Sequence, residues 1–349
     1  MRFTRLIFFA LLALGFSACE RAPLHRQESF VFGTRVEILI AGMDEAAARQ
    51  AASVVLKEFD RLHRSYHAWE ASELSAMNDA LASGQTRIVS PELAFLLTDA
   101  QRRSAMSGAL FDPGIGKLIR LWGFHSDAFK PSLPDPEKIA VWLKARPGLA
   151  DLSVDGIKDG IKVNSANPEV LVDLGGYLKG FALDRADRLL RTQGVTNALV
   201  NIGGNIMALG TKNGRPWRVG IQHPRQPGAM ATVQLKDGEA IGTSGDYQRY
   251  FELDGKRYCH LIDPRTGAPV AHTRSLTILV TPRENAGTLS DAASKPLFIA
   301  GEHWPELAKK MAVKNVLRVD AAGKIQVSES FMERIEFVGG KPHFLEIVR

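Results

Sequence analysis

The second half of the sequence is a succession of short segments in which apolar and polar residues alternate between turn residues. They cover residues 198–209, 217–222, 250–260, 275–281 and 316–327. Such alternation is typical of strands with one buried face, and Asp254-Gly255 is the kind of turn that joins antiparallel neighbours in a hairpin. We therefore expect a mixed or largely antiparallel sheet, which disfavours a doubly wound dinucleotide-binding fold.

Helical patterns dominate the first half of the chain. Residues 30–40 have the alternation of a half-buried strand, and apolar residues then fall on one helical face over residues 44–63. Further helices are predicted over residues 91–104 and 177–194. With 45% hydrophobic and 23% charged residues and no clear linker, the sequence predicts one large α+β (mixed α/β) domain over residues 30–349, with helices flanking the sheet.

The N-terminus has the pattern of an export signal. It reads MRFTRLIFFALLALGFSAC, with a basic start and an apolar run over residues 6–16 that is too short to cross a bilayer, which needs about 20 residues. The small residues before Cys19 resemble a bacterial lipobox, in which the cysteine is lipidated. This predicts a lipoprotein signal peptide over residues 1–18, a lipidated Cys19 with a tether over residues 19–29, and a lipid-anchored protein of the bacterial cell envelope facing the periplasm. An ordinary signal peptide with an incidental Cys19 is the alternative.

The net charge indicates the class of ligand, and the cysteine content bears on whether the fold contains a disulfide. The formal net charge of +6 favours an anionic small molecule over nucleic acid. Two cysteines are too few for a disulfide scaffold, and if Cys19 carries a lipid then Cys259 has no partner.

The segment VDLGGYLKGFALD, residues 172–184, is the most informative for function. It places Asp173, two glycines and Lys179 within seven residues at the opening of a predicted helix, an arrangement that suits a ligand bearing phosphate. A tight strand-to-helix turn with solvated charges is an equally good interpretation. Ser244 and Asn205, in other glycine-containing turns, are further candidate donors to a ligand.

Two later segments add candidate catalytic groups. His260 is suited to take a proton from a hydroxyl near neutral pH, and Asp263 could orient its imidazole. Asp291 could bind Mg²⁺, although its spacing favours a helix cap. The sequence has no H-E-x-x-H, G-x-S-x-G or EF-hand pattern, which weighs against the commonest metalloproteases, α/β-hydrolases and calcium sensors.

Taken in order, segments across most of the chain resemble the ApbE family, the FAD:protein FMN transferases, which are often envelope lipoproteins. These segments are FGTRVEI (32–38), SELSAMN (72–78), GALFDPGIGKLIRLWGF (108–124), VDLGGYLKGFALD, LVNIGGNIMALG (199–210), WRVGIQHP (217–224), AIGTSGDYQRY (240–250), HLIDPRTGAP and SDAASKPLF. The resemblance implies transfer of the FMN half of FAD to a Thr or Ser hydroxyl of a target protein. A phosphoester forms, AMP is released, and the reaction uses Mg²⁺.

The resemblance also implies a role for individual residues. His260 would be the base for the target hydroxyl, and Gly176 and Asp291 would face the Mg²⁺. The expected contacts with FAD, including Ser244 from the glycine-containing turn and one of two aromatic residues, are Phe32, Tyr66 or Trp69, Ala109, Leu110, Phe111, Asp173, Lys179, Ser244 and Ile262.

The chain departs from the family pattern at one position. Four residues after the aspartate, where D-A-x-x-T supplies a threonine to the metal, it has Lys295. A protonated lysine cannot coordinate Mg²⁺ and would repel it. Either the ammonium takes over part of the metal's role on the pyrophosphate, or it points away and pairs with Asp291.

The expected activity is flavin transfer to a membrane or periplasmic redox protein. The alternatives are an FAD-binding lipoprotein without activity and an FAD pyrophosphatase that gives FMN and AMP.

Overall fold

A large sheet forms the centre of the computed structural model, which describes residues 23–126 and 131–349. Within these residues the sheet has nine strands, in the order β1-β2-β6-β7-β10-β15-β16-β17-β19. Neighbouring strands are antiparallel except β17 and β19, which are parallel. The predicted α+β fold with a mostly antiparallel sheet is confirmed, whereas the predicted signal peptide and Cys19 lie outside the described residues.

The strands of this sheet come from both ends of the chain. Their bounds are β1 (Leu24–Val31), β2 (Thr34–Ala41), β6 (Ala198–Ile202), β7 (Asn205–Leu209), β10 (Ala240–Gly245), β15 (Thr273–Val280), β16 (Asn315–Asp320), β17 (Ile325–Ser328) and β19 (Leu345–Val348).

The N-terminal hairpin corrects two predictions. Residues 30–40, expected as one strand, contain a turn at Phe32 and Gly33, both with positive φ. Residues 24–29, expected as a tether, belong to β1, which pairs with β2 along its whole length. Because β1 is an edge strand with mostly exposed or half-buried side chains, its sequence is as polar as that of a linker.

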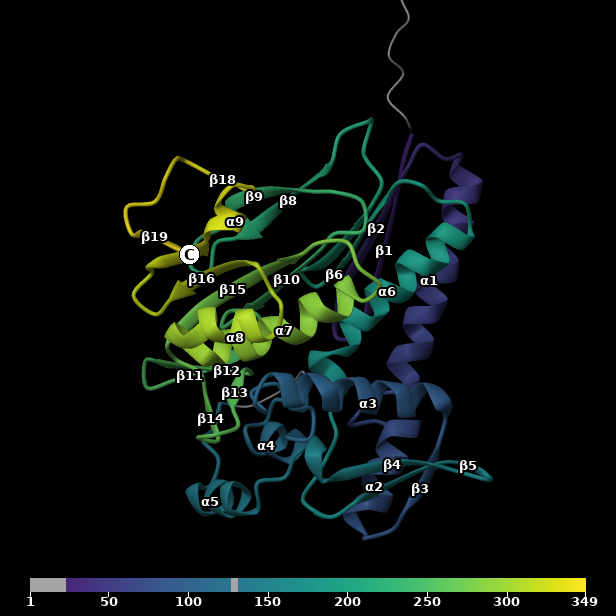
Figure 1. Ribbon diagram of the computed structural model, residues 1–349, viewed down its shortest axis with the longest axis vertical. Helices are drawn as coiled ribbons and strands as arrows, with labels where there is room; N and C mark the ends of the chain where they lie inside the picture. Colours follow the sequence, from purple (N-terminus) through teal and green to yellow (C-terminus); the bar gives the residue numbers. More distant parts are fainter. Residues whose placement is uncertain (1–22, 127–130) are drawn as a thin grey trace, which may run out of the picture.

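The large sheet is covered on both faces (Figure 1). One face packs on helices α1 (Glu45–Ser65), α6 (Leu178–Thr192) and α7 (Ala286–Ala300), with α8 (Trp304–Lys310) beside α7. The other face packs on a three-stranded sheet of β8 (Trp217–Gln222), β9 (Ala229–Leu235) and β18 (Ile335–Phe337), with α9 (Glu329–Met332) at its edge. Two apolar cores therefore hold the sheet between helices and a second sheet. Among the described residues, no helix has the length and apolar character needed to span a bilayer.

The residues between α1 and α6 form a separate lobe, the lower part of Figure 1. Its elements are α2 (Glu73–Ala82), β3 (Arg87–Val89), α3 (Pro91–Met106), α4 (Gly116–Leu121), α5 (Pro136–Ala145), β4 (Leu152–Ile157) and β5 (Gly160–Ser165), with short 3₁₀ turns at Leu149–Asp151 and Leu174–Gly176.

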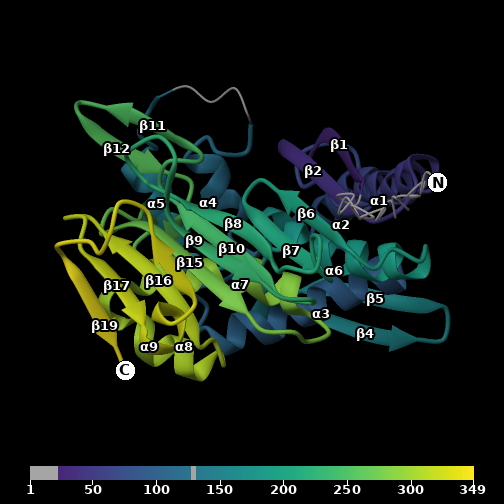
Figure 2. The same ribbon diagram turned by 90° about the horizontal axis from the view of Figure 1, so that it is seen from above.

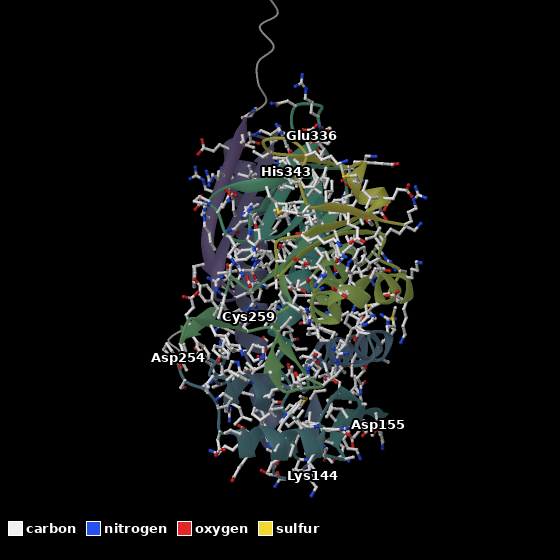
Figure 3. All side chains as sticks on the ribbon, turned by 90° about the vertical axis from the view of Figure 1, so that its left-hand side faces the viewer. Lys144, Asp155, Asp254, Cys259, Glu336 and His343 are labelled. Atoms are coloured by element: carbon white, nitrogen blue, oxygen red, sulfur yellow. The ribbon has the colours of Figure 1, made fainter. Side chains whose placement is uncertain are left out.

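Two small hairpins join the sheet to this lobe (Figures 1 and 2). They are β11 (Tyr250–Leu253) with β12 (Lys256–Cys259), and β13 (Ile262–Asp263) with β14 (Ala268–Pro269). A small apolar cluster packs Phe251 and Ile262 of the hairpins against Leu118 of α4 and Trp142 of α5. In Figure 3, Asp254 projects at the tip of the first hairpin, while Cys259, at its base, lies inside the molecule.

Helices α6 and α7 cross at close range, and an aspartate of each helix caps the N-terminus of the other. Asp184 of α6 accepts hydrogen bonds from the backbone N–H groups of Gly287 (2.7 Å) and Thr288 (2.8 Å), in the first turn of α7. Asp291 of α7 accepts one from the N–H of Gly180 (2.9 Å), in the first turn of α6. Asp291 thus lies in the second turn of a helix that begins at Ala286. The expectation that it caps its own helix is wrong, because it caps the neighbouring one.

We expect Gly180→Ala to destabilise the protein. A Cβ at this position would lie 2.4 Å from the carbonyl oxygen of Gly287, so one helix would have to move. The free energy of unfolding, measured by urea denaturation, should fall by about 2 kcal/mol. Gly156→Ala is the matched control, because nothing lies within 4 Å of its added Cβ, and its effect should stay within about 0.5 kcal/mol. Equal stability of the two variants would refute the close crossing.

Candidate active site

Several predicted site residues converge where the large sheet meets the lower lobe. Asp173 precedes the 3₁₀ turn Leu174–Gly176, Lys179 lies in the first turn of α6, and His260 lies between β12 and β13. Each is only partly exposed to solvent. Burial lowers the pKa of both His260 and Lys179; the charges of Lys179 and Lys295 add to the lowering at His260, and the charge of Asp291 opposes the lowering at Lys179.

Asp173 is positioned by a residue that is distant in the sequence but belongs to the same lobe. Asn78 of α2 donates its side-chain amide to the carbonyl of Val172 and accepts the N–H of the same residue, both at 2.9 Å. The carboxylate of Asp173 then accepts the N–H of Gly175 at 2.8 Å. Burial raises the pKa of Asp173, while the Gly175 N–H and the positive charge of Arg249 act in the opposite direction.

His260 is oriented by the main chain rather than by a carboxylate. Its Nδ1 lies 3.1 Å from the carbonyl oxygen of Arg249, which can only accept a hydrogen bond, so Nδ1 carries the proton. The expectation that Asp263 orients this ring is wrong. The carboxylate of Asp263 instead pairs with the side chain of Arg265 (2.8 Å) and accepts its N–H (2.9 Å).

The imidazole of His260 is neutral at physiological pH. Burial, followed by the positive charge of Lys179, lowers its pKa to about 3. The same burial lowers the pKa of Lys179. With the proton fixed on Nδ1, the other ring nitrogen, Nε2, is unprotonated and able to accept a proton from a hydroxyl.

A metal ion does not fit at Asp291. Oδ1 of its carboxylate accepts bonds from Nζ of Lys295 (2.5 Å) and Nδ2 of Asn205 (3.0 Å), and Oδ2 accepts the N–H of Gly180. Lys295 forms the ion pair with Asp291, but its stem lies against Gly176 and therefore does not point away from the site. The predicted metal role of Gly176 and Asp291 does not agree with this geometry.

The two aromatic candidates differ in position. Tyr66 is buried in the main core, and its hydroxyl donates to Glu92 at 2.6 Å. Trp69 is half-buried, lies close to the carboxylate of Asp173 and lies under the guanidinium of Arg120, whose Cζ is 5.0 Å from the ring centroid. Trp69 is therefore the aromatic side chain beside the site.

The other predicted FAD contacts divide into exposed and buried residues. Phe32 is half-buried, with its ring 5.7 Å from that of His63, and Ala109 is exposed in the turn after α3. Leu110 is half-buried, whereas Phe111 lies in the main core and Ile262 in the small apolar cluster. Ser244 is buried, and its hydroxyl bonds that of Ser294 on α7 at 2.8 Å.

Sequence reasoning missed two residues of this site. Asn78 lies within the SELSAMN segment, but no local pattern indicates that it bonds residue 172. Arg249, within AIGTSGDYQRY, influences the pKa of Asp173, Lys179 and His260 and donates to the carbonyl groups of Phe124 and Ser126. It is a third basic side chain at this junction.

A neutral histidine beside several basic side chains is the arrangement of an enzyme that moves a proton next to an anionic group. The profile described as the ApbE family matches residues 32–317. The chain belongs to the ApbE family.

Relatives and solved structures agree with this assignment. An FAD:protein FMN transferase of Rhodobacter capsulatus is 40% identical over 94% of this chain, which spans 61% of that protein's length. One of Escherichia coli (strain K12) is 32% identical over 91% of both chains. The crystal structure of the ApbE protein from Thermotoga maritima has a TM-score of 0.81 at 31% identity, covering 89% of this chain and 99% of that one. The flavin transferase ApbE from Vibrio cholerae has a TM-score of 0.76 at 27% identity, covering 90% and 99%.

We expect the imidazole of His260 to stay neutral, with its proton on Nδ1, from pH 8 down to about pH 4, because its pKa is about 3. Lys179→Met should raise this pKa, since it removes a positive charge that disfavours the imidazolium. Nitrogen-15 NMR of the histidine rings would measure both the tautomer and the titration. Conversion to imidazolium near pH 6 in the unsubstituted protein would contradict the expectation.

Proposed function

We propose that this protein is an FAD:protein FMN transferase, as its curated relatives are named. The observation that carries the proposal is His260, neutral and with Nε2 unprotonated, beside Lys179 and Arg249. The substrate has a pyrophosphate, whose negative charge suits these basic side chains, and the acceptor has a hydroxyl that must lose a proton.

The reaction needs one proton transfer and one exchange of bonds at phosphorus. The hydroxyl oxygen of an acceptor Thr or Ser attacks the phosphorus on the FMN side of the pyrophosphate. The bond from that phosphorus to the bridging oxygen breaks, and AMP leaves with that oxygen. Nε2 of His260 takes the hydroxyl proton, while Lys179 stabilises the negative charge on the phosphate oxygens.

The remaining residues bind and orient the substrate. Trp69 offers an aromatic face to the flavin, and Asp173, held through Asn78 and Val172, lies next to it. The half-buried Phe32 and the exposed Ala109 are further contacts with FAD in this proposal. The acceptor is a membrane or periplasmic redox protein in this proposal.

The proposal includes a lipid anchor at Cys19, supported by the sequence of residues 1–19 alone. We expect Cys19→Ser to abolish incorporation of labelled palmitate and to move the protein from the detergent-rich to the aqueous phase of Triton X-114, because the acyl chains are the anchor. Cys259→Ser is the control, since that thiol is buried. Retention of the label in Cys19→Ser would disprove the anchor.

His260→Ala should lower flavin transfer at least about 100-fold, the usual contribution of a positioned base, and leave FAD binding nearly unchanged. The assay incubates the protein with FAD and an acceptor domain, and follows in-gel flavin fluorescence together with AMP release. His343→Ala is the control, because His343 is exposed and lies near the top of the view in Figure 3, well above Cys259.

The same assay separates the alternatives. Bound FAD with neither product would indicate a binding protein, and AMP with free FMN would indicate a pyrophosphatase. Unchanged transfer by His260→Ala would refute the assigned base.

A further inference from the structure

The carboxylate of Asp291 is closed to a metal ion by its neighbours. Its side chain is 1% exposed, and its two oxygens accept three hydrogen bonds, from Lys295, Asn205 and Gly180. A divalent cation prefers such oxygens as ligands and would have to displace these donors. In the part of the chain that the structure describes, no group of three or more His, Cys, Asp or Glu residues could hold a metal ion.

Lys295 reaches both residues that were expected to face the metal, Gly176 and Asp291. Its Cδ and Cε lie 3.1 and 3.0 Å from where a Cβ on Gly176 would be, so the aliphatic stem crosses the glycine turn. Nζ donates to the carboxylate of Asp291 and, at 2.8 Å, to its carbonyl oxygen. An ammonium has three N–H donors, so one remains for an anion.

The partial exposure of the Lys295 side chain is consistent with its ammonium binding an anion. Its side chain is 17% exposed, whereas that of Asp291 beneath it is almost fully covered. Lys295 also lies close enough to Lys179 and His260 to lower the pKa of both. Lys295 is therefore the more accessible member of this ion pair.

We propose that Lys295 replaces the divalent metal ion in this protein: its ammonium bonds the pyrophosphate of FAD, and binding and transfer proceed without a metal. This inference rests on the proposed function. Lys179 adds a further positive charge, which offsets the lower charge of an ammonium relative to a dication. In the transfer step, Lys295 neutralises charge on the phosphate oxygens and gives up no proton.

Metal and FAD binding test the proposal without requiring transfer. Manganese binding is measured by electron paramagnetic resonance of the protein with Mn²⁺, and FAD affinity by flavin fluorescence in EDTA and in millimolar Mg²⁺. The wild type should not bind Mn²⁺ tightly, and its FAD affinity should be the same in both media. Stoichiometric Mn²⁺ binding, or loss of FAD affinity in EDTA, would overturn the proposal.

Two substitutions of Lys295 should distinguish whether FAD affinity depends on the charge of the ammonium or on a bound metal ion. Lys295→Met should weaken FAD binding about 10- to 100-fold, the effect of losing a hydrogen bond between charged groups. Lys295→Thr supplies a hydroxyl oxygen instead, so its FAD affinity should become sensitive to EDTA. Lys324→Met, which removes a lysine from a surface ion pair with Glu346, is the matched control. Wild-type FAD affinity in Lys295→Met would refute the role of the ammonium.

Lys295→Met leaves the buried carboxylate of Asp291 without its counter-ion, so this variant could fail to fold. A second variant keeps the test informative in that case. The double variant Asp291→Asn/Lys295→Met removes both charges and should show the same weakened FAD binding. If the wild type binds FAD equally in EDTA and Mg²⁺ but transfers no flavin in either medium, the transferase proposal fails while the replacement of the metal in binding stands.

Discussion

Helices α6 and α7 cap each other: the carboxylate of Asp291 on α7 accepts a hydrogen bond from the first turn of α6, and that of Asp184 on α6 accepts two from the first turn of α7. The first N–H groups of a helix have no partner within it, and a negative charge there interacts favourably with the helix dipole. Neither helix supplies its own side-chain cap at this end. The two N-termini are therefore completed only when the helices cross, and the crossing requires glycine at 180 and 287.

This exchange also sets the geometry of the site. Lys179 is adjacent to Gly180, and Lys295 lies one turn after Asp291, so both lysines are fixed by the bonds that hold the helices together. The same carboxylate of Asp291 serves as a cap for α6 and as the counter-ion of Lys295. The stability of the helix crossing and the binding of substrate thus both depend on the buried carboxylate of Asp291. Because its oxygens already accept these hydrogen bonds, they have little room for another ligand.

The sequence predicted the sheet type, the main helices and most of the residues at the junction. It failed where local pattern carries no information. The polar edge strand β1 resembles a linker, and α7 is buried over most of its surface, so no amphipathic pattern marks its start. The bonds of Asn78 to Val172 join segments 94 residues apart and cannot be inferred from spacing. The predicted hairpin places residues 249 and 260 opposite each other, but only the structure shows that the ring of His260 bonds the carbonyl oxygen of Arg249. Lys295 was recognised because it departs from a motif, but only the structure places its ammonium on Asp291.

The orientation of His260 has a consequence for how this site tolerates mutation. A base held by an aspartate can be disabled by one substitution of that aspartate, but the acceptor here is the carbonyl group of residue 249, which every amino acid possesses. No codon change at that position deletes it. Substitutions of Arg249 therefore remove the guanidinium, with its charge and its bonds to Phe124 and Ser126, but keep the tautomer of the base.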